Sequence, residues 1–264
     1  MNILKFLESL SNENMTKATA SRRESFGQFG QIGKNLAFAS IPFGLAALTS
    51  KSYANDIPVT PSDPVGALSL ALTLEYLEKE FYETALSTLG LILPGRERNV
   101  FTQIAAHEAD HVTFLTSGLQ ANGAPVPVKP TFDFTVDGAF DPFGDYQTFL
   151  QFAQAFEDTG VRAYKGQAGN LISTPDLLTY ALQIHSVEAR HASEVRRIRG
   201  LKGWISGDTS GLDPAFNASY AGEDNTNQAG FNASAQFGAA AGSESFDEPL
   251  TTAQAVAIAN IFIV

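Results

Sequence analysis

The sequence predicts an all-α fold, a four-helix bundle in which one long connection joins the second helix to the third. Four stretches repeat apolar residues at spacings of three and four, which is typical of helices buried on one side. Short turns separate the first helix from the second and the third from the fourth, whereas residues 123–144 lie between the middle two. This order of connections is that of a bundle with a single long crossover.

The four helices are expected over residues 63–90, 97–121, 145–171 and 174–200. Asp63 is a good N-cap and Pro64 suits the first helical position. Asn122-Gly123, followed by Pro125, ends the second helix. Thr174-Pro175-Asp176 is a capping signature for the fourth.

The remaining segments contain less regular patterns. Residues 123–144 hold three prolines in their first eight positions, and we expect an ordered crossover with room for a short strand. Residues 203–248 are rich in Gly, Ala, Ser and Asn, and we expect loop there. A short helix over 252–262 ends the chain. The predicted division is therefore a leading segment 1–54, a bundle 55–202 and a C-terminal extension 203–264.

Composition excludes several classes of protein. The 264 residues contain no Cys, which excludes disulfide scaffolds, iron–sulfur clusters and thiol catalysis. The formal net charge of -11 argues against nucleic acid as a partner. No apolar run reaches about 18 residues, so no stable membrane span is expected. Assembly into a homo-oligomer stays open.

The first 54 residues differ in charge from the rest. They carry 6 Lys/Arg and 3 Asp/Glu, against 11 and 25 in residues 55–264. Arg22-Arg23 precedes an apolar stretch over 36–48, and Ser52-Tyr53-Ala54 follows with small residues suited to signal cleavage. The arginine pair resembles a twin-arginine signal without its usual later residues. We therefore predict an exported protein, periplasmic or extracellular.

Each helix carries a carboxylate in the middle of its apolar face, among residues such as Leu72 and Leu89 on the first helix. A buried carboxylate is costly unless it is paired, protonated or bound to a metal. The pattern Glu-x6-Tyr followed by Glu-x-x-His occurs twice. Its members are Glu75, Tyr82, Glu108 and His111 in the first half, and Glu157, Tyr164, Glu188 and His191 in the second. Residues three apart lie on one helix face, so each Glu and His can reach a common ion.

These residues carry a family resemblance. The chain resembles the ferritin-like superfamily, in particular exported ferritin-like proteins related to plant desiccation-related proteins. The similar stretches are LEYLEKEFY at 74–82, HEADH at 107–111, FEDTGVRAYKG at 156–166, HSVEARHA at 185–192 and FDEPL at 246–250.

The resemblance implies a centre of two Fe or Mn ions. In it Glu75 and Glu157 are terminal ligands, Glu108 and Glu188 bridge, and His111 and His191 bind one metal each. Such a centre would react with dioxygen or peroxide, as a ferroxidase-like or manganese-catalase-like oxidoreductase in stress protection. The alternative is a non-enzymatic exported stress or structural bundle. Iron storage in a cage fits less well, because the export signal and the tail are foreign to cage ferritins.

Several neighbouring residues allow more than one interpretation. Glu78 is expected in solvent or outside the ligand set, with an extra-ligand role as the alternative. Tyr82 and Tyr164 either hydrogen-bond the opposite carboxylates, take part in electron transfer as catalytic residues, or only pack. His107 and His185 either line the metal cavity or cap the core. Surface exposure is expected for Asp110, Asp158 and Arg190, with support of the metal ligands by hydrogen bonds as the alternative.

One motif points elsewhere. The segment from His107 to His111 is a literal H-E-x-x-H, the pattern of zinc proteases in which both histidines bind zinc and Glu108 is the general base. That hypothesis leaves Glu75, Glu157 and the second Glu-x-x-His unexplained. It is the remote alternative.

The export hypothesis predicts a processed protein. We expect the exported form to begin at Asn55 or Asp56, determined by N-terminal sequencing. Replacing Arg22 and Arg23 with Lys should retain the protein in the cytoplasm, because the receptor reads the arginine pair. Unchanged export of this variant, or an exported form that starts at Met1, would contradict the hypothesis.

Overall fold

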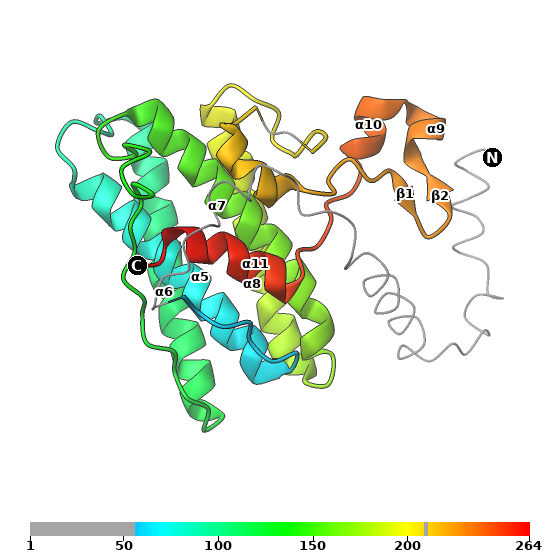
Figure 1. Ribbon diagram of the computed structural model, residues 1–264, viewed down its shortest axis with the longest axis horizontal. Coiled ribbons are helices and arrows are strands. Elements are labelled where there is room, and N and C mark those ends of the chain that lie inside the picture. Colours follow the sequence, from blue (N-terminus) through cyan, green and yellow to red (C-terminus); the bar gives the residue numbers. More distant parts are fainter. Residues whose placement is uncertain (1–55, 209–210) are drawn as a thin grey trace. The chain divides into compact units, whose positions relative to one another are not determined.

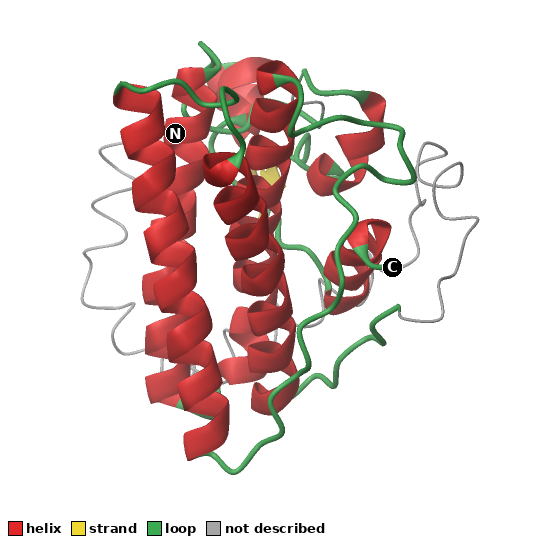
Figure 2. Cartoon of the chain, turned by 90° about the vertical axis from the view of Figure 1, so that its left-hand side faces the viewer, coloured by secondary structure: helices red, strands yellow, loops and turns green. Residues whose placement is uncertain are grey.

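A computed structural model of the chain describes residues 56–208 and 211–264. The predicted leading segment 1–54 lies outside these residues. Within them, four long helices lie side by side (Figures 1 and 2). Their bounds are Pro64–Ser87 for α5, Arg96–Ala121 for α6, Tyr146–Gln167 for α7 and Pro175–Ile198 for α8. The predicted all-α four-helix bundle is confirmed.

The helices pack as the connections require. The short turns bring α5 against α6 and α7 against α8, and the two pairs meet through α5 and α7 and through α6 and α8. No helix among the described residues is long and apolar enough to cross a lipid bilayer.

The predicted cap of α5 forms, the predicted cap of α8 does not, and Asp145 caps α7 although the sequence patterns did not single it out. The side chains of Asp63 and Asp145 accept hydrogen bonds from the backbone N–H groups of Gly66 and Thr148, at 2.7 Å each. Thr174 precedes α8 as expected, but its hydroxyl donates to the carbonyl of Leu171 and gives no cap bond to the helix.

The first helix is shorter than predicted. Thr88 has extended dihedral angles that end α5 at Ser87. Leu89, expected on the apolar face, is consequently fully exposed, with a relative accessibility of 101%. In the third helix, a 3₁₀ turn over Ala168–Leu171 (η1) replaces the last predicted α-turn.

The crossover is ordered through its contact with the chain end. Phe132 forms an isolated antiparallel bridge with Ile263 in place of the strand that the sequence allowed. Asp133 N–H donates to the carbonyl of Phe262 at 2.8 Å. The end itself is α11, Thr252–Ala259, followed by the 3₁₀ turn η3, Asn260–Phe262, in agreement with the predicted short helix.

The segment 203–248 contains more structure than predicted. The expectation of loop was wrong for five short elements: η2 (Pro214–Tyr220), β1 (Asn227–Gln228), β2 (Phe231–Asn232), α9 (Ala233–Phe237) and α10 (Ala239–Ser243). The two strands pair antiparallel, Asn227 with Asn232 and Gln228 with Phe231. Such short elements have little hydrophobic periodicity, because their order depends on contacts with the bundle rather than on local propensity.

The two ends of the bundle core differ in composition. One end is filled by aromatic rings, among them Phe81, Phe101, Phe149, Phe152 and Tyr82. Phe81 stacks on Phe149 with ring centroids 5.2 Å apart. The other end is built from Leu and Ala side chains with Tyr164 as its large residue. The carboxylates of the sequence repeat lie between these two layers.

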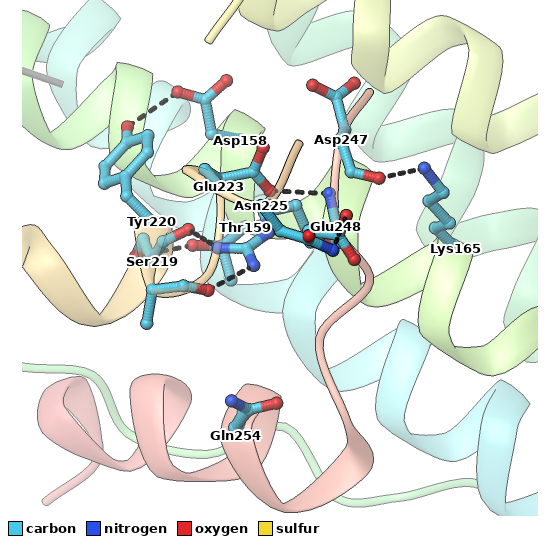
Figure 3. A network of polar contacts seen from close by, with 12 residues as sticks. Asp158, Thr159, Lys165, Ser219, Tyr220, Glu223, Asn225, Asp247, Glu248 and Gln254 are labelled. Atoms are coloured by element: carbon cyan, nitrogen blue, oxygen red, sulfur yellow. Dashed lines mark hydrogen bonds and ion pairs between the residues drawn. The ribbon is translucent and has the colours of Figure 1, made fainter. Parts of the chain in front are cut away.

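Helix α7 is buried on nearly every side, and the C-terminal extension covers its outer face. The guanidinium of Arg162 is 1% exposed and pairs with Glu223 at 2.7 Å. It also donates to the backbone carbonyls of Ser219, Ala221 and Glu248. Figure 3 shows the surrounding polar network, which ties η2 and the segment before α11 to the bundle.

A second buried group extends this network. Asp158, expected at the surface, is 3% exposed and pairs with Arg196 of α8. The hydroxyl of Tyr220 donates to the same carboxylate at 2.7 Å (Figure 3). The expectation of exposure was wrong because helical periodicity alone does not reveal that a later segment covers this face.

The Arg162 contacts predict a large effect on stability. We expect Arg162→Met to lower the free energy of unfolding by about 3–5 kcal/mol, because it leaves a buried carboxylate and several carbonyls unpaired. The control is Lys129→Met, which removes a half-exposed ion pair with Glu80 and should cost about 0–1 kcal/mol. Chemical denaturation measures both values. Equal, small losses would contradict the proposed importance of the buried pair.

Candidate metal centre

The six predicted metal ligands converge in the middle of the bundle, each helix contributing at least one. Four carboxylates, those of Glu75, Glu108, Glu157 and Glu188, are 0% exposed. The side chains of His111 and His191 are 11% and 5% exposed. Their donor atoms form two groups that could each hold a metal ion, Glu75, Glu108, His111 and Glu188 in one and Glu108, Glu157, Glu188 and His191 in the other.

His111 faces three carboxylates through one ring nitrogen. Its Nδ1 lies 3.2 Å from Glu75 Oε2 and 3.0 Å from both Glu108 Oε2 and Glu188 Oε1. One ring nitrogen carries at most one proton, so it cannot donate to three oxygens at once. The three oxygens and the nitrogen therefore face a common point, where a cation that displaces the ring proton would meet all four atoms.

His191 has the same arrangement in the other half. Its Nδ1 lies 2.9 Å from Glu108 Oε1 and 3.3 Å from Glu157 Oε2 and Glu188 Oε2. Several of these buried atoms have no hydrogen-bond partner of acceptable geometry: Glu108 Oε1, Glu157 Oε2, both Glu188 oxygens and His191 Nδ1. Unsatisfied buried polar atoms are rare in folded proteins and call for an explanation.

Glu108 and Glu188 occupy the space between the two histidines. Each directs one carboxylate oxygen toward His111 and the other toward His191. Glu75 and Glu157 each face a single histidine. The Glu-x-x-His spacing produces this geometry because residues three apart lie on one face of α6 and of α8.

The two tyrosines cross-link the halves. Tyr82 of α5 donates to Glu157 Oε1 of α7 at 2.5 Å, and Tyr164 of α7 donates to Glu75 Oε1 of α5 at 2.5 Å. The predicted bonds to the opposite carboxylates are thus present. Burial, then the adjacent carboxylates, raises the pKa of both phenols well above 10. The hydroxyls therefore keep their protons at neutral pH, and their role as catalytic residues stays a prediction.

A fifth buried carboxylate lies beside the six residues. Glu78 is only 3% exposed, so of the two places expected for it the one in solvent was wrong, while a place beside the ligands is consistent with its burial. It has room because Gly160 stands opposite on α7: a Cβ there would lie 3.2 Å from Glu78 Oε1. The signal was present in the sequence, since Gly160 follows Glu157 at the spacing at which Glu78 follows Glu75.

His107 supports His191 and not the H-E-x-x-H arrangement. His107 Nδ1 lies 2.8 Å from His191 Nε2, and Gln103 Nε2 lies 2.8 Å from His107 Nε2. Burial and the two neighbouring histidines lower the pKa of His107, which favours the neutral ring. His107 belongs to neither of the groups that could hold metal. Because His107 holds Nε2 of His191, the other ring nitrogen, Nδ1, is oriented toward the carboxylates.

Other residues near the motif lie apart from the centre. His185 is half-buried at the edge of the bundle, and its buried Nδ1 has no hydrogen-bond partner. Asp110 and Arg190 are exposed, as expected.

Protons balance part of the buried charge. Burial raises the pKa of Glu157 to about 7 and those of Glu108 and Glu78 well above their usual range. Burial alone would lower the pKa of His111, but hydrogen bonds to its carboxylate neighbours raise it to about 12. Burial likewise opposes ionisation of Glu188, yet both histidines lower its pKa to about 2. Without a cation, the cluster therefore mixes protonated and charged groups.

The donor set fits a pair of first-row transition metals. Carboxylate oxygens and imidazole nitrogens suit Fe and Mn, and no thiolate is present in the sequence. Bundles with a Glu from each of two helices and Glu-x-x-His from each of the other two hold di-iron or di-manganese centres. The unpartnered oxygens around both histidines are in keeping with that use.

Comparison with known families agrees with this architecture. The family model described as a ferritin-like domain matches residues 63–201, just over half of the chain and all four helices. Among curated proteins, no relative matches the chain.

The pKa shifts predict how metal and pH act together. Glu157 binds its proton more tightly in the metal-free fold, at about pH 7, than in the unfolded chain, at about 4.5. The metal-free fold therefore loses stability as pH rises through this interval. Cations replace these protons, so we expect the rise in melting temperature caused by Mn(II) to grow from about pH 5 to about pH 8.

Differential scanning fluorimetry across this range provides the measurement. Glu157→Gln should weaken the pH dependence, whereas Glu83→Gln, an exposed carboxylate on the same bundle, should leave it unchanged. A metal-induced gain that is equal at every pH would show that protons and metal do not compete.

Proposed function

The chain belongs to the ferritin-like domain family, and on the geometry of its buried cluster we propose that it holds a dinuclear Fe or Mn centre. One observation carries the proposal: Glu108 and Glu188 each direct one oxygen to each histidine. Glu75 and His111 would complete the coordination of one ion, and Glu157 and His191 that of the other. These assignments agree with the ligand set that the family resemblance implies.

We propose redox chemistry as the activity. A pair of Fe or Mn ions supplies electron exchange with dioxygen or peroxide. The reaction would be oxidation of Fe(II) or removal of peroxide, in stress protection. Burying four or five carboxylates lowers the free energy of unfolding, and a bundle with a purely structural role would gain nothing in return. This cost favours a working site over the alternative, a non-enzymatic stress or structural protein.

The chain's own residues would prepare the site. Tyr82 and Tyr164 fix the orientation of Glu157 and Glu75 through their hydrogen bonds. His107 restrains the ring of His191. Apolar layers at both ends of the bundle exclude bulk water, which strengthens every electrostatic interaction inside. Glu78 offers a further carboxylate within the same buried volume.

The place of action is a separate part of the proposal. The basic leading segment, with its arginine pair and apolar stretch, supports export to the periplasm or the exterior. Relationship to desiccation-related proteins rests on the quoted sequence stretches.

Metal content tests the proposal directly. We expect about two Fe or Mn per chain, measured by elemental analysis of protein from its native compartment. Glu108→Ala and Glu188→Ala should lose most metal because each removes a residue facing both positions. His111→Ala and His191→Ala should weaken binding equally. Asp110→Ala, which changes an exposed residue of the same helix, is the control.

The alternatives give distinct results. One zinc per chain, lost in His107→Ala and His111→Ala but not in His191→Ala, would support the protease hypothesis instead. Two ions without Fe(II) oxidation or peroxide consumption would support the non-enzymatic bundle. If Glu78→Ala removes metal as severely as Glu75→Ala, Glu78 belongs to the ligand set. Tyr82→Phe and Tyr164→Phe, assayed for both reactions, test the tyrosines.

A further inference from the structure

An apolar cavity of about 220 Å³ lies in the bundle next to the candidate metal centre. All four helices contribute to its wall. The wall residues stand one helical turn from the cluster: Ala71 precedes Glu75 by four residues, Leu115 follows His111 by four, and Ile184 precedes Glu188 by four. The cavity therefore adjoins the centre along the bundle axis.

Small side chains create this space. The wall includes Ala67, Ala71, Gly118, Ala163 and Ala181. At the opposite end of the bundle, phenylalanine rings fill the corresponding layers. Protein interiors normally leave few voids larger than a water molecule, because an apolar void lowers stability in proportion to its volume. A void retained at one end of an otherwise well-packed bundle indicates a use.

The wall offers little to a polar occupant. The hydroxyl of Tyr164 is bound to Glu75, and the side chain of Gln167 hydrogen-bonds Thr252 and Asn170. The amide of Asn122 donates to the carbonyl of Gly118. A charged ligand would lose its hydration without gaining a counterion. An apolar cavity of about 150 Å³ stays dry and binds benzene, so this one suits roughly ten non-hydrogen atoms.

Two half-exposed aromatic rings form the outer wall of the cavity. Phe114 of α6 and Tyr180 of α8 are 42% and 43% exposed and meet edge to face, with ring centroids 5.3 Å apart. The inner wall is the ring of Tyr164, whose hydroxyl contacts a predicted terminal ligand. An occupant of the cavity would therefore lie between these two surface rings and the tyrosine that is hydrogen-bonded to Glu75.

We propose that this cavity binds a neutral, apolar small molecule of about the size of naphthalene, held against Tyr164 beside the centre. A role for this molecule as an organic co-substrate or modulator of a metal centre rests on the proposed function. Binding of the molecule in the cavity does not. The proposal thus assigns a ligand class, uncharged aromatic or short hydrocarbon, to a site distinct from the metal ligands.

Fluorescence titration of the full chain with naphthalene, in metal-free and manganese-loaded forms, tests this site. We expect saturable binding of one molecule per chain. Naphthalene-2-sulfonate should bind at least about a hundredfold more weakly, because its charge has no partner inside. Ala181→Leu fills the cavity and should weaken naphthalene binding about tenfold or more. The control Ala189→Leu enlarges an exposed side chain on the same helix and should bind as the parent does.

The outcomes separate the two proposals. Equal binding of naphthalene by the parent and Ala181→Leu, or equal affinity for the sulfonate, overturns the cavity site. Ala71→Leu, on the opposite wall, gives the same decision if Ala181→Leu does not fold. If neither manganese nor iron binds, the proposed function fails, yet titration of the metal-free chain still decides whether the cavity binds an apolar ligand.

Discussion

Burial of five carboxylates in one bundle core is the constraint on which the rest of the structure depends. Glu75, Glu78, Glu108, Glu157 and Glu188 are at most 3% exposed and lie between two apolar layers. Their repulsion and desolvation must be offset, and the offsets are visible: two histidines, two tyrosine hydroxyls and raised pKa values. Cations would offset the same charge more completely, in keeping with the several buried oxygens that have no hydrogen-bond partner of acceptable geometry.

The sequence repeat produces an approximate two-fold symmetry between the two helix pairs. Some corresponding positions hold different residues, and these differences show where the two halves have different surroundings. Glu78 on α5 corresponds to Gly160 on α7, so one extra carboxylate occupies the space of a missing side chain. His107 on α6 corresponds to Val187 on α8, so only His191 has a histidine partner. Phenylalanines close one end of the core and alanines the other. The symmetric residues form the cluster, and the asymmetric ones shape its surroundings.

Helix number, order and the convergence of the six predicted ligands followed from sequence because each depends on local spacing. Asp63 caps its helix as expected, and Glu-x-x-His places its side chains on one helix face. Burial of Glu78 and Asp158 did not follow, because it depends on what a distant segment brings opposite them. The short elements of 203–248 have no periodicity of their own for the same reason. The domain boundaries, export and the ligand roles remain predictions.

Helix α7 shows why the C-terminal extension matters to the site. Glu157 points into the carboxylate cluster, while its neighbour Asp158 and the buried Arg162 face the extension through Tyr220 and Glu223. Without the extension, the outer face of α7 would present an unpaired Arg162 and several apolar rings to water. The contacts of Arg162 and Asp158 on the outer side of α7 hold the same helix that carries Glu157 on its inner side. The extension therefore contributes to the geometry of the cluster without supplying a ligand.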